Sequence, residues 1–506
     1  MQLRRARWSL VSLAMITLVG VFPIRETAGQ VFERVSVGNG GVEGDAASEF
    51  ADATGDGRFV TFFTFAANFF PGDAPVTFGQ GTGYTDVFVR DRVAGTLTLV
   101  SVATDGVSLA NSFSFNPVIS DNGRFVAFES FATNITAAPV VGFGDMYLRD
   151  LNTGTTQLIS VALGGGPGDG PSGPQVRPSA ISADGGLLAF ESQATNLTAD
   201  ADTNSVFDLF LRDTVAGTTT LVSRAVGGGA GNGQSFAPAI SPDGRYLAFV
   251  SDATDLVPND TNGVSDVFVY DTLNATIALA SRHTNGTLAD AGSFRPVVSN
   301  TGVVTFGSPA TNLVNVDANG PIADMFLHDV NTGVTTLVAP GGLQGDSDSG
   351  DRGKPAITPD GRFIAFETLA ANWSTADTNA ARDVYVYDSL NDTMTLASMN
   401  RSCIVGDLES RIPSLRNDGR MVFFHGASTN FVPDANTAND VFASAVVVRG
   451  DIDGDGTVNP SDTAGFVAVL LGQDADPVRS AAADLNCDGA ADGSDMASFV
   501  AAILAP

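Results

Sequence analysis

Oxygen-bearing residues recur at regular spacing in a short segment near the C-terminus. Side-chain oxygens, or a backbone carbonyl at position 7, occupy positions 1, 3, 5, 7, 9 and 12 of a loop that begins at Asp451, and Gly456 occupies position 6. Hard oxygen donors in this register suit calcium, and glycine at position 6 permits the sharp turn that such a loop makes. The predicted ligands are Asp451, Asp453, Asp455, the Thr457 carbonyl, Asn459 and Asp462.

The same spacing returns 33 residues later, again with a glycine, Gly489, at position 6. The predicted ligands of this second loop are Asp484, Asn486, Asp488, the Ala490 carbonyl, Asp492 and Asp495. Two acidic turns without a metal would not require that glycine twice. An apolar-periodic helix follows each loop, over residues 463–471 and 496–504. The sequence therefore predicts a small α-helical module at 450–506 that binds two Ca²⁺ ions.

The details of this module resemble dockerin type I repeats more than paired EF-hands. Position 12 is aspartate in both loops, and no helix leads into Asp451. The resemblance covers residues 450–506 and implies binding to a cohesin-like domain or another surface receptor, with specificity set largely by loop positions 10 and 11 and by the helix that follows each loop. Carried over to this sequence, those positions are Pro460, Ser461, Gly493 and Ser494. They differ from the commonest cellulosomal pairs, so the identity of the partner stays open.

A unit of about 60 residues repeats seven times before this module. A turn glycine marks each copy, at Gly57, Gly123, Gly185, Gly244, Gly302, Gly361 and Gly419. A later strand opens with aspartate in each copy, at Asp86, Asp145, Asp208, Asp266, Asp324, Asp383 and Asp440. Each copy thus offers four short strands: one before the turn, one after it, the aspartate-led strand, and a run such as Thr220-Leu-Val-Ser223.

The repeats predict an all-β, seven-bladed β-propeller over residues 30–449. A single four-stranded sheet cannot bury both of its faces, whereas several sheets packed around an axis can. The last copy lacks its fourth strand, while the strand-like segment 31–37 at the start of the chain belongs to no copy. Donating this N-terminal strand to the last blade would close the ring and remove an open sheet edge.

The repeat motif also carries a family resemblance. Ile240-Ser-Pro-Asp-Gly-Arg-Tyr-Leu-Ala-Phe249 and the matching segment 357–366 resemble the repeats of TolB-type, WD40-like propellers. Segments 184–186 and 300–302 depart from the pattern. The resemblance implies the fold and says little about function, because such propellers serve as scaffolds, receptors and accessory domains of enzymes.

Alternating strand directions place the long loops, within and between blades, on one face of the predicted propeller, where binding usually occurs. Five intra-blade loops contain an Asp-x-Asn triplet. The residues are Asp202 and Asn204, Asp260 and Asn262, Asp317 and Asn319, Asp377 and Asn379, and Asp434 and Asn436. Their oxygens have the chemistry to hold calcium or another ligand. Asx side chains also cap turns without a metal; the sequence favours turn capping and leaves both interpretations open.

The N-terminus indicates export. Three arginines, at positions 4, 5 and 7, precede an apolar run over 9–22, and small residues at 27 and 29 suit a cleavage site, so residues 1–29 read as a signal peptide. A membrane anchor would need an apolar run of roughly 18 residues or more. We therefore expect a bacterial protein that is secreted or associated with the cell surface, and that does not span the membrane after signal removal.

The mature chain is strongly acidic. Removing residues 1–29 takes away four arginines and one glutamate, so the formal net charge changes from −30 to −33. Such a surface repels nucleic acid, and nucleic acid is not expected as a partner. Cys403 and Cys487 are the only cysteines. They are too few for a disulfide framework, and the sequence leaves open whether they pair.

Two functions are compatible with these features. The favoured one is a binding or scaffold protein, with a glycan or protein ligand on the loop face of the propeller. The alternative is an extracellular polysaccharide-degrading enzyme, a glycoside hydrolase or lyase, or an accessory subunit of a catabolic complex. Such an enzyme would need a pair of carboxylates. Glu129, Glu191 and Glu367 occupy equivalent places after the second strand of three blades, which marks them as repeat residues. We predict no catalytic residues.

Overall fold

The computed structural model describes residues 32–75, 83–137, 143–173, 178–200, 202–400, 402–454, 458–474, 476–488 and 490–504. The predicted signal peptide, and Asp455 and Thr457 of the first calcium loop, lie outside these residues. The chain divides between Val448 and Arg449 into two compact units, a β-sheet unit and a small helical unit. No helix in the described parts of the chain is long and apolar enough to cross a membrane.

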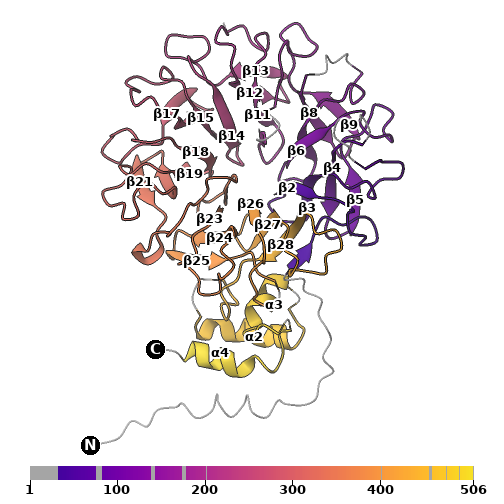
Figure 1. Cartoon of the computed structure of the whole chain (residues 1–506), viewed down its shortest axis with the longest axis vertical. Helices are drawn as coiled ribbons and strands as arrows, with labels where there is room; N and C mark the ends of the chain where they lie inside the picture. The colour runs from indigo at the N-terminus through magenta and orange to yellow at the C-terminus, as the bar shows by residue number, and fades with distance from the viewer. Residues whose placement is uncertain are drawn as a thin grey trace, which may run out of the picture. The chain divides into compact units, whose positions relative to one another are not determined.

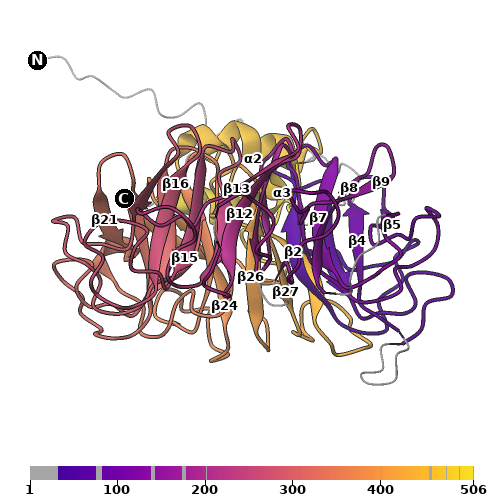
Figure 2. The ribbon, with the colours of Figure 1, turned by 90° about the horizontal axis from the view of Figure 1, so that it is seen from above.

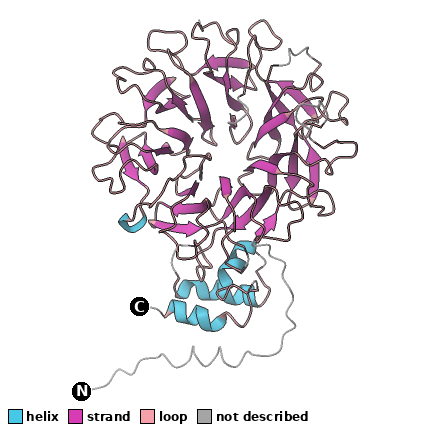
Figure 3. Ribbon diagram, viewed as in Figure 1, coloured by secondary structure: helices cyan, strands magenta, loops and turns pink. Residues whose placement is uncertain are grey.

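The β-sheet unit is a seven-bladed propeller, in which seven antiparallel four-stranded sheets surround a central axis (Figures 1 and 3). Figure 2 shows the blades edge-on, with their strands running between the two faces of the disc. Blades 1 to 3 are β2 (Ser48–Ala53), β3 (Phe59–Thr64), β4 (Asp86–Asp91) and β5 (Thr96–Leu99); β6 (Ser114–Ile119), β7 (Phe125–Ser130), β8 (Asp145–Asp150) and β9 (Thr155–Leu158); and β10 (Ala180–Ile181), β11 (Leu187–Ser192), β12 (Asp208–Asp213) and β13 (Thr218–Leu221).

The remaining blades follow the same order. Blades 4 to 6 are β14 (Ser235–Ile240), β15 (Tyr246–Ser251), β16 (Asp266–Asp271) and β17 (Thr276–Leu279); β18 (Phe294–Val298), β19 (Val303–Ser308), β20 (Asp324–Asp329) and β21 (Val334–Leu337); and β22 (Ala356–Ile357), β23 (Phe363–Thr368), β24 (Asp383–Asp388) and β25 (Thr393–Leu396). Blade 7 consists of β26 (Ser410–Leu415), β27 (Met421–Gly426), β28 (Asp440–Ala445) and β1 (Phe32–Arg34). A short 3₁₀ helix, η1 (Pro340–Gly342), follows blade 5.

The ring closes through its first strand, as the sequence predicts. β1 pairs antiparallel with β28, with Phe32 opposite Ser444 and Arg34 opposite Phe442. Phe32 is buried and packs against Phe431 and Phe442, at ring-centroid distances of 4.8 and 5.3 Å. The N-terminal strand therefore supplies both the missing strand and part of the core of the last blade.

Residue chemistry explains the turns and the core of each blade. In blade 4, Gly244 adopts φ +77°, which glycine tolerates best, and Asp243 Oδ1 accepts bonds from Ser241 Oγ and the Arg245 N–H. Aromatic rings on the second and third strands then stack inside the blade. Phe249 and Phe268 are fully buried, with ring centroids 5.7 Å apart. The turn thus fixes the register that buries the aromatic face.

The described residues of the helical unit form one 3₁₀ helix and three α-helices: η2 (Pro460–Asp462), α2 (Thr463–Leu470), α3 (Pro477–Ala483) and α4 (Met496–Ile503). The two helices predicted after the calcium loops correspond to α2 and α4. Phe466 of α2 and Phe499 of α4 are buried, and their rings stack with centroids 4.0 Å apart. Helix α3 was not predicted from the sequence; Asp476 caps its first turn by accepting the Val478 and Arg479 N–H groups.

Candidate functional site

The first loop of the helical unit is organised around Asp462, its predicted position-12 ligand. Asp462 is fully buried; its Oδ1 accepts the N–H groups of Ile452 and Asp453 at 2.6 and 3.0 Å, and its Oδ2 accepts the Asn459 N–H at 3.0 Å. One carboxylate oxygen each from Asp451, Asp453 and Asp462 lies within 4.8 Å of the others. Three carboxylates in so small a space repel one another unless a cation neutralises them.

The second loop repeats this arrangement around Asp495. Asp495 is fully buried; its Oδ1 accepts the N–H groups of Leu485 and Asn486 at 2.8 and 3.0 Å, and its Oδ2 accepts the Asp492 N–H at 2.9 Å. Asp484 Oδ1 accepts the Asp488 N–H at 3.2 Å. The two loops therefore share one hydrogen-bonding scheme, and their oxygen-rich donor set fits a calcium ion.

The four residues expected to contact a partner are all exposed. Pro460 and Ser461 lie at the start of η2, and Gly493 and Ser494 precede α4. Ser461 Oγ donates to Asp453 Oδ2 at 2.6 Å, and Ser494 Oγ accepts from Asn486 Nδ2 at 2.6 Å. Each of these serines is therefore tied to its own loop, so a change in loop geometry would move the surface that it presents.

The Asp-x-Asn triplets of the propeller serve mainly as loop anchors. In blade 3, Asn204 Nδ2 donates to Asp208 Oδ2 at 2.9 Å and to the Gly231 carbonyl at 2.8 Å, and its Oδ1 accepts the Val206 N–H. Asn379, Asp383, Gly406 and Ala381 make the same bonds in blade 6. In blade 5, Asn319 donates to Asp324 and Gly345, and Asp317 Oδ1 accepts from Gln344. This is the capping role that the sequence favours.

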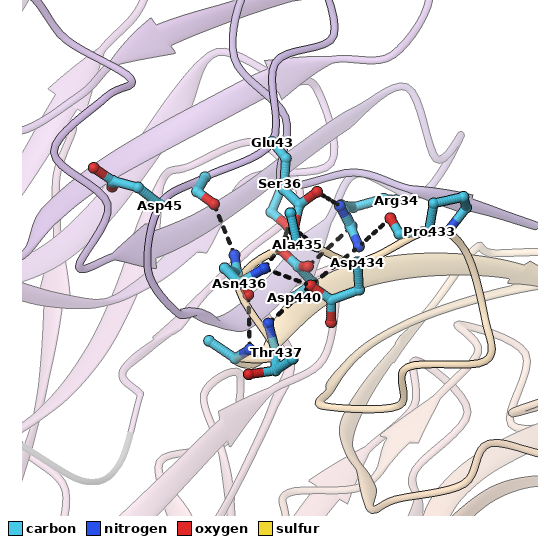
Figure 4. Close-up of polar contacts among 12 residues, drawn as sticks. Arg34, Ser36, Glu43, Asp45, Pro433, Asp434, Ala435, Asn436, Thr437 and Asp440 are labelled. Carbon is cyan, nitrogen blue, oxygen red and sulfur yellow. Dashed lines mark hydrogen bonds and ion pairs between the residues drawn. The ribbon is translucent and has the colours of Figure 1, made fainter.

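Blade 7 differs because an arginine lies among its carboxylates (Figure 4). Arg34 Nη1 lies 2.6 Å from Glu43, and Arg34 Nε lies 2.9 Å from Asp440. Arg34 Nη2 lies 3.7 Å from Asp434. Asn436 of the triplet donates to the Gly44 carbonyl and accepts the Ala438 N–H, as in the other anchors. A guanidinium group thus supplies the positive charge at this site.

A pairing that the sequence analysis missed links the third and fourth strands. The aspartate that opens the third strand accepts a bond from the serine of the Leu-Val-Ser segment, as in Asp86–Ser101 and Asp266–Ser281, both 2.6 Å. Burial raises the pKa of Asp86 to about 7 and that of Asp266 to about 6. The nearby charge of Asp260 adds to the rise at Asp266. The aspartate and the serine both recur in the repeats, but whether they meet depends on the register between the third and fourth strands.

The equivalent glutamates lie inside the second strands β7, β11 and β23, not after them as the sequence analysis placed them. Glu191 Oε1 accepts the Ala237 N–H of the next blade at 2.7 Å, and Glu367 Oε2 accepts the Ile412 N–H at 3.1 Å. His425 Nδ1 has the same role for the Phe50 N–H at 3.3 Å. These N–H groups belong to left-handed residues at bulges in the first strands. Glu191, Glu367 and His425 therefore connect neighbouring blades.

A cavity of about 190 Å³ lies at the propeller axis and is lined by the first strands. Its charged groups include Asp52 and Lys354, the only lysine of the chain. Lys354 donates to the Pro238 carbonyl at 3.1 Å, and Asp52 accepts the Ile119 N–H at 2.9 Å. Burial lowers the pKa of Lys354 to about 8 and raises that of Asp52 to about 6. Both groups have partners within the fold, so the cavity is a secondary candidate.

Comparison with known families decides the identity of the helical unit. Residues 449–504 match the model of the dockerin type I domain. The dockerin prediction is confirmed. Dockerin domains typically bind calcium, dock onto cohesins, and occur in extracellular or cell-surface complexes. No curated protein matches the chain.

Solved structures similar to this chain include propellers of the TolB type, as predicted. TolB from Acinetobacter baumannii is 15% identical with a TM-score of 0.35, over 61% of this chain and 58% of TolB. The chain thus spans little more than half the length of TolB. An oligogalacturonate lyase from Vibrio parahaemolyticus is 13% identical with a TM-score of 0.47, over 82% of this chain and 96% of the lyase. At these identities the similarity concerns the fold alone.

Proposed function

We propose that this protein is a non-catalytic binding or scaffold protein that docks through its dockerin in a calcium-dependent manner. The observation that carries the proposal is the pair of matching loops within the dockerin match, in which Asp462 and Asp495 make the same three bonds. Two Ca²⁺ ions bind, one per loop. Their ligands are the twelve residues predicted from the sequence, from Asp451 to Asp462 and from Asp484 to Asp495.

Docking follows from calcium binding. In each loop the position-12 aspartate bonds to the start of its own loop and directly precedes the helix whose phenylalanine forms the dockerin core. A cation held by the loop therefore fixes the exposed residues Pro460, Ser461, Gly493 and Ser494 relative to α2 and α4. These residues contact a cohesin-like domain or another surface receptor, and the protein acts outside the cell or at its surface after loss of residues 1–29.

The propeller is proposed to bind rather than to catalyse. Two of the three equivalent glutamates accept hydrogen bonds from backbone N–H groups of the neighbouring blade; they are Glu191 and Glu367. His425 accepts such a bond too. Carboxylates committed to holding the fold are poor acids, bases or nucleophiles for a glycosidic bond. The proposed ligand, a glycan or a protein, binds the loop face.

One experiment separates the binding proposal from the enzyme alternative. The full chain is incubated with a panel of insoluble polysaccharides in calcium buffer, and both depletion of the protein and released sugars are measured. Depletion by at least one polysaccharide without soluble product supports the proposal, as does binding of a type I cohesin domain only when calcium is present. Reproducible release of reducing sugar or of unsaturated oligosaccharide would establish the enzyme instead.

A further inference from the structure

Three buried oxygens in blade 4 lack hydrogen-bond partners. They are Asp260 Oδ1, Asn262 Oδ1 and Asp266 Oδ2, and each is shielded from solvent. Asp260 is 92% buried and Asp266 is fully buried, while Asp266 Oδ1 accepts from Ser281. Leaving such acceptors unpaired away from water costs free energy, more so for charged groups. Three unpaired oxygens on residues 260–266 therefore point to a cation.

Among the described triplets, the one in blade 4 alone leaves all three of these oxygens unpaired. In blades 3 and 6 the asparagine amide turns its N–H toward the strand aspartate, at 2.9 Å in both Asn204–Asp208 and Asn379–Asp383. In blade 4, Asn262 Nδ2 donates to the Ala289 carbonyl at 3.2 Å, the bond that Asn204 and Asn379 make to Gly231 and Gly406, while Asp266 Oδ2 has no hydrogen-bond partner. Asn262 Oδ1 is also without a partner, and Asp260 lies near enough to Asp266 to raise the pKa of that group.

In blade 7 an arginine of the chain neutralises the two carboxylates that correspond to Asp260 and Asp266. Arg34 lies opposite Phe442, and Leu279 lies opposite Phe268, so these two residues hold equivalent positions in blades 7 and 4. The guanidinium of Arg34 lies within ion-pair distance of Asp434 and Asp440, the counterparts of Asp260 and Asp266. Leu279 brings no charge, and no described arginine or lysine forms an ion pair with Asp260 or Asp266.

We propose that Asp260, Asn262 and Asp266 bind a calcium ion within blade 4 of the propeller. Two carboxylate oxygens and one amide oxygen form a hard donor set whose charge balances a divalent cation. Calcium accepts about six to eight oxygens in flexible geometry, so water and backbone carbonyls can complete the shell. The ion takes the electrostatic part that Arg34 has in blade 7 and fixes the long loop between β15 and β16 on the proposed binding face. The site is independent of the dockerin.

Calcium titration of the full chain tests this site. The background carries Asp451→Ala and Asp484→Ala, which remove the position-1 ligands of both dockerin loops. In it, isothermal titration calorimetry should find one remaining calcium ion per chain. Asp260→Asn should abolish that binding, whereas the matched change in blade 3, Asp202→Asn, should leave it intact. Circular dichroism in chelator should show the same propeller spectrum for all three proteins.

A variant that should bind calcium more tightly distinguishes loss of a ligand from misfolding, because a misfolded protein would not gain affinity. Asn262→Asp adds a third carboxylate and should tighten the remaining site by about tenfold, because charge count tunes calcium affinity. Calcium should also raise the unfolding midpoint of the background protein and not that of the Asp260→Asn protein. The proposal is overturned if the background protein binds no calcium, or if Asp260→Asn binds it as well as Asp202→Asn does.

Discussion

Arg34 Nε lies 2.9 Å from Asp440 Oδ2 and so joins the first strand of the propeller to the strand that it completes. The contact spans almost the whole propeller sequence, and both side chains are almost fully buried. Ser36 adds a 2.7 Å bond to the other oxygen of Asp440. Closure therefore combines an ion pair and a hydrogen bond with the apolar packing of Phe32.

Removing Arg34 alone should destabilise the ring more than removing it together with one of its carboxylate partners. Arg34→Leu installs the residue type found at the equivalent Leu279 but leaves Asp440, Asp434 and Glu43 without their cation. A buried charge left unpaired in this way costs about 3–5 kcal/mol. Adding Glu43→Leu should recover part of the loss. Urea unfolding measures both variants, and Arg58→Ala, which removes the half-exposed arginine paired with Asp91, should lower the midpoint less than Arg34→Leu does. Equal stability of wild type and Arg34→Leu would contradict this account of closure.

The apolar half of the closure can be tested at Phe32. Phe32→Ala removes a ring packed against Phe424, Phe431 and Phe442 and should lower the free energy of unfolding by about 3–5 kcal/mol. Phe143→Ala, at a half-exposed phenylalanine, is the matched control and should cost much less. Deletion of residues 31–37 should have a still larger effect in thermal unfolding. A truncated protein as stable as the parent would show that the ring does not need this strand.

Asp86 should make the stability of the propeller depend on pH. Its pKa is about 7 when folded and about 3.9 in an unfolded chain. Between these values the folded protein binds more protons, so this group lowers the free energy of unfolding as pH rises, by about 1.4 kcal/mol per pH unit. His425 acts oppositely, because burial lowers its pKa to about 3.

The contribution of Asp86 is isolated by comparing variants. Asp86→Asn retains an oxygen that can accept from Ser101 and does not titrate, so it should gain stability relative to wild type as pH rises from 5 to 7.5. Asp105→Asn is the control: hydrogen bonds from Ser108 hold the pKa of Asp105 below its usual value, outside this window. Thermal unfolding at several pH values provides the measurement. A difference between Asp86→Asn and wild type that does not change with pH would refute the assignment.

The repeat spacing was sufficient to predict the blades and their closure, because strand length, turn glycines and a missing fourth strand are local features. The dockerin module was equally predictable, because its motif consists of side chains at fixed offsets. The contact of Asp86 with Ser101 was not visible, because it depends on pairing between β4 and the segment after β5. The Asp-x-Asn triplets show the same limit: Asn204 and Asn262 occupy matching positions, yet only the fold shows that Asn204 Oδ1 accepts the Val206 N–H while Asn262 Oδ1 is unpaired.

We propose that calcium folds the dockerin and so makes it able to bind its partner. Limited proteolysis of the full chain tests this most directly. The loops gather carboxylates that repel without a cation, and so short a segment buries little apolar surface to compensate. Mass spectrometry of the digest should show an intact chain in calcium, and rapid loss of residues 450–506 from a resistant propeller in chelator. The chain with Asp451→Ala and Asp484→Ala should lose this segment even in calcium. A dockerin segment equally resistant in calcium and in chelator would contradict the account.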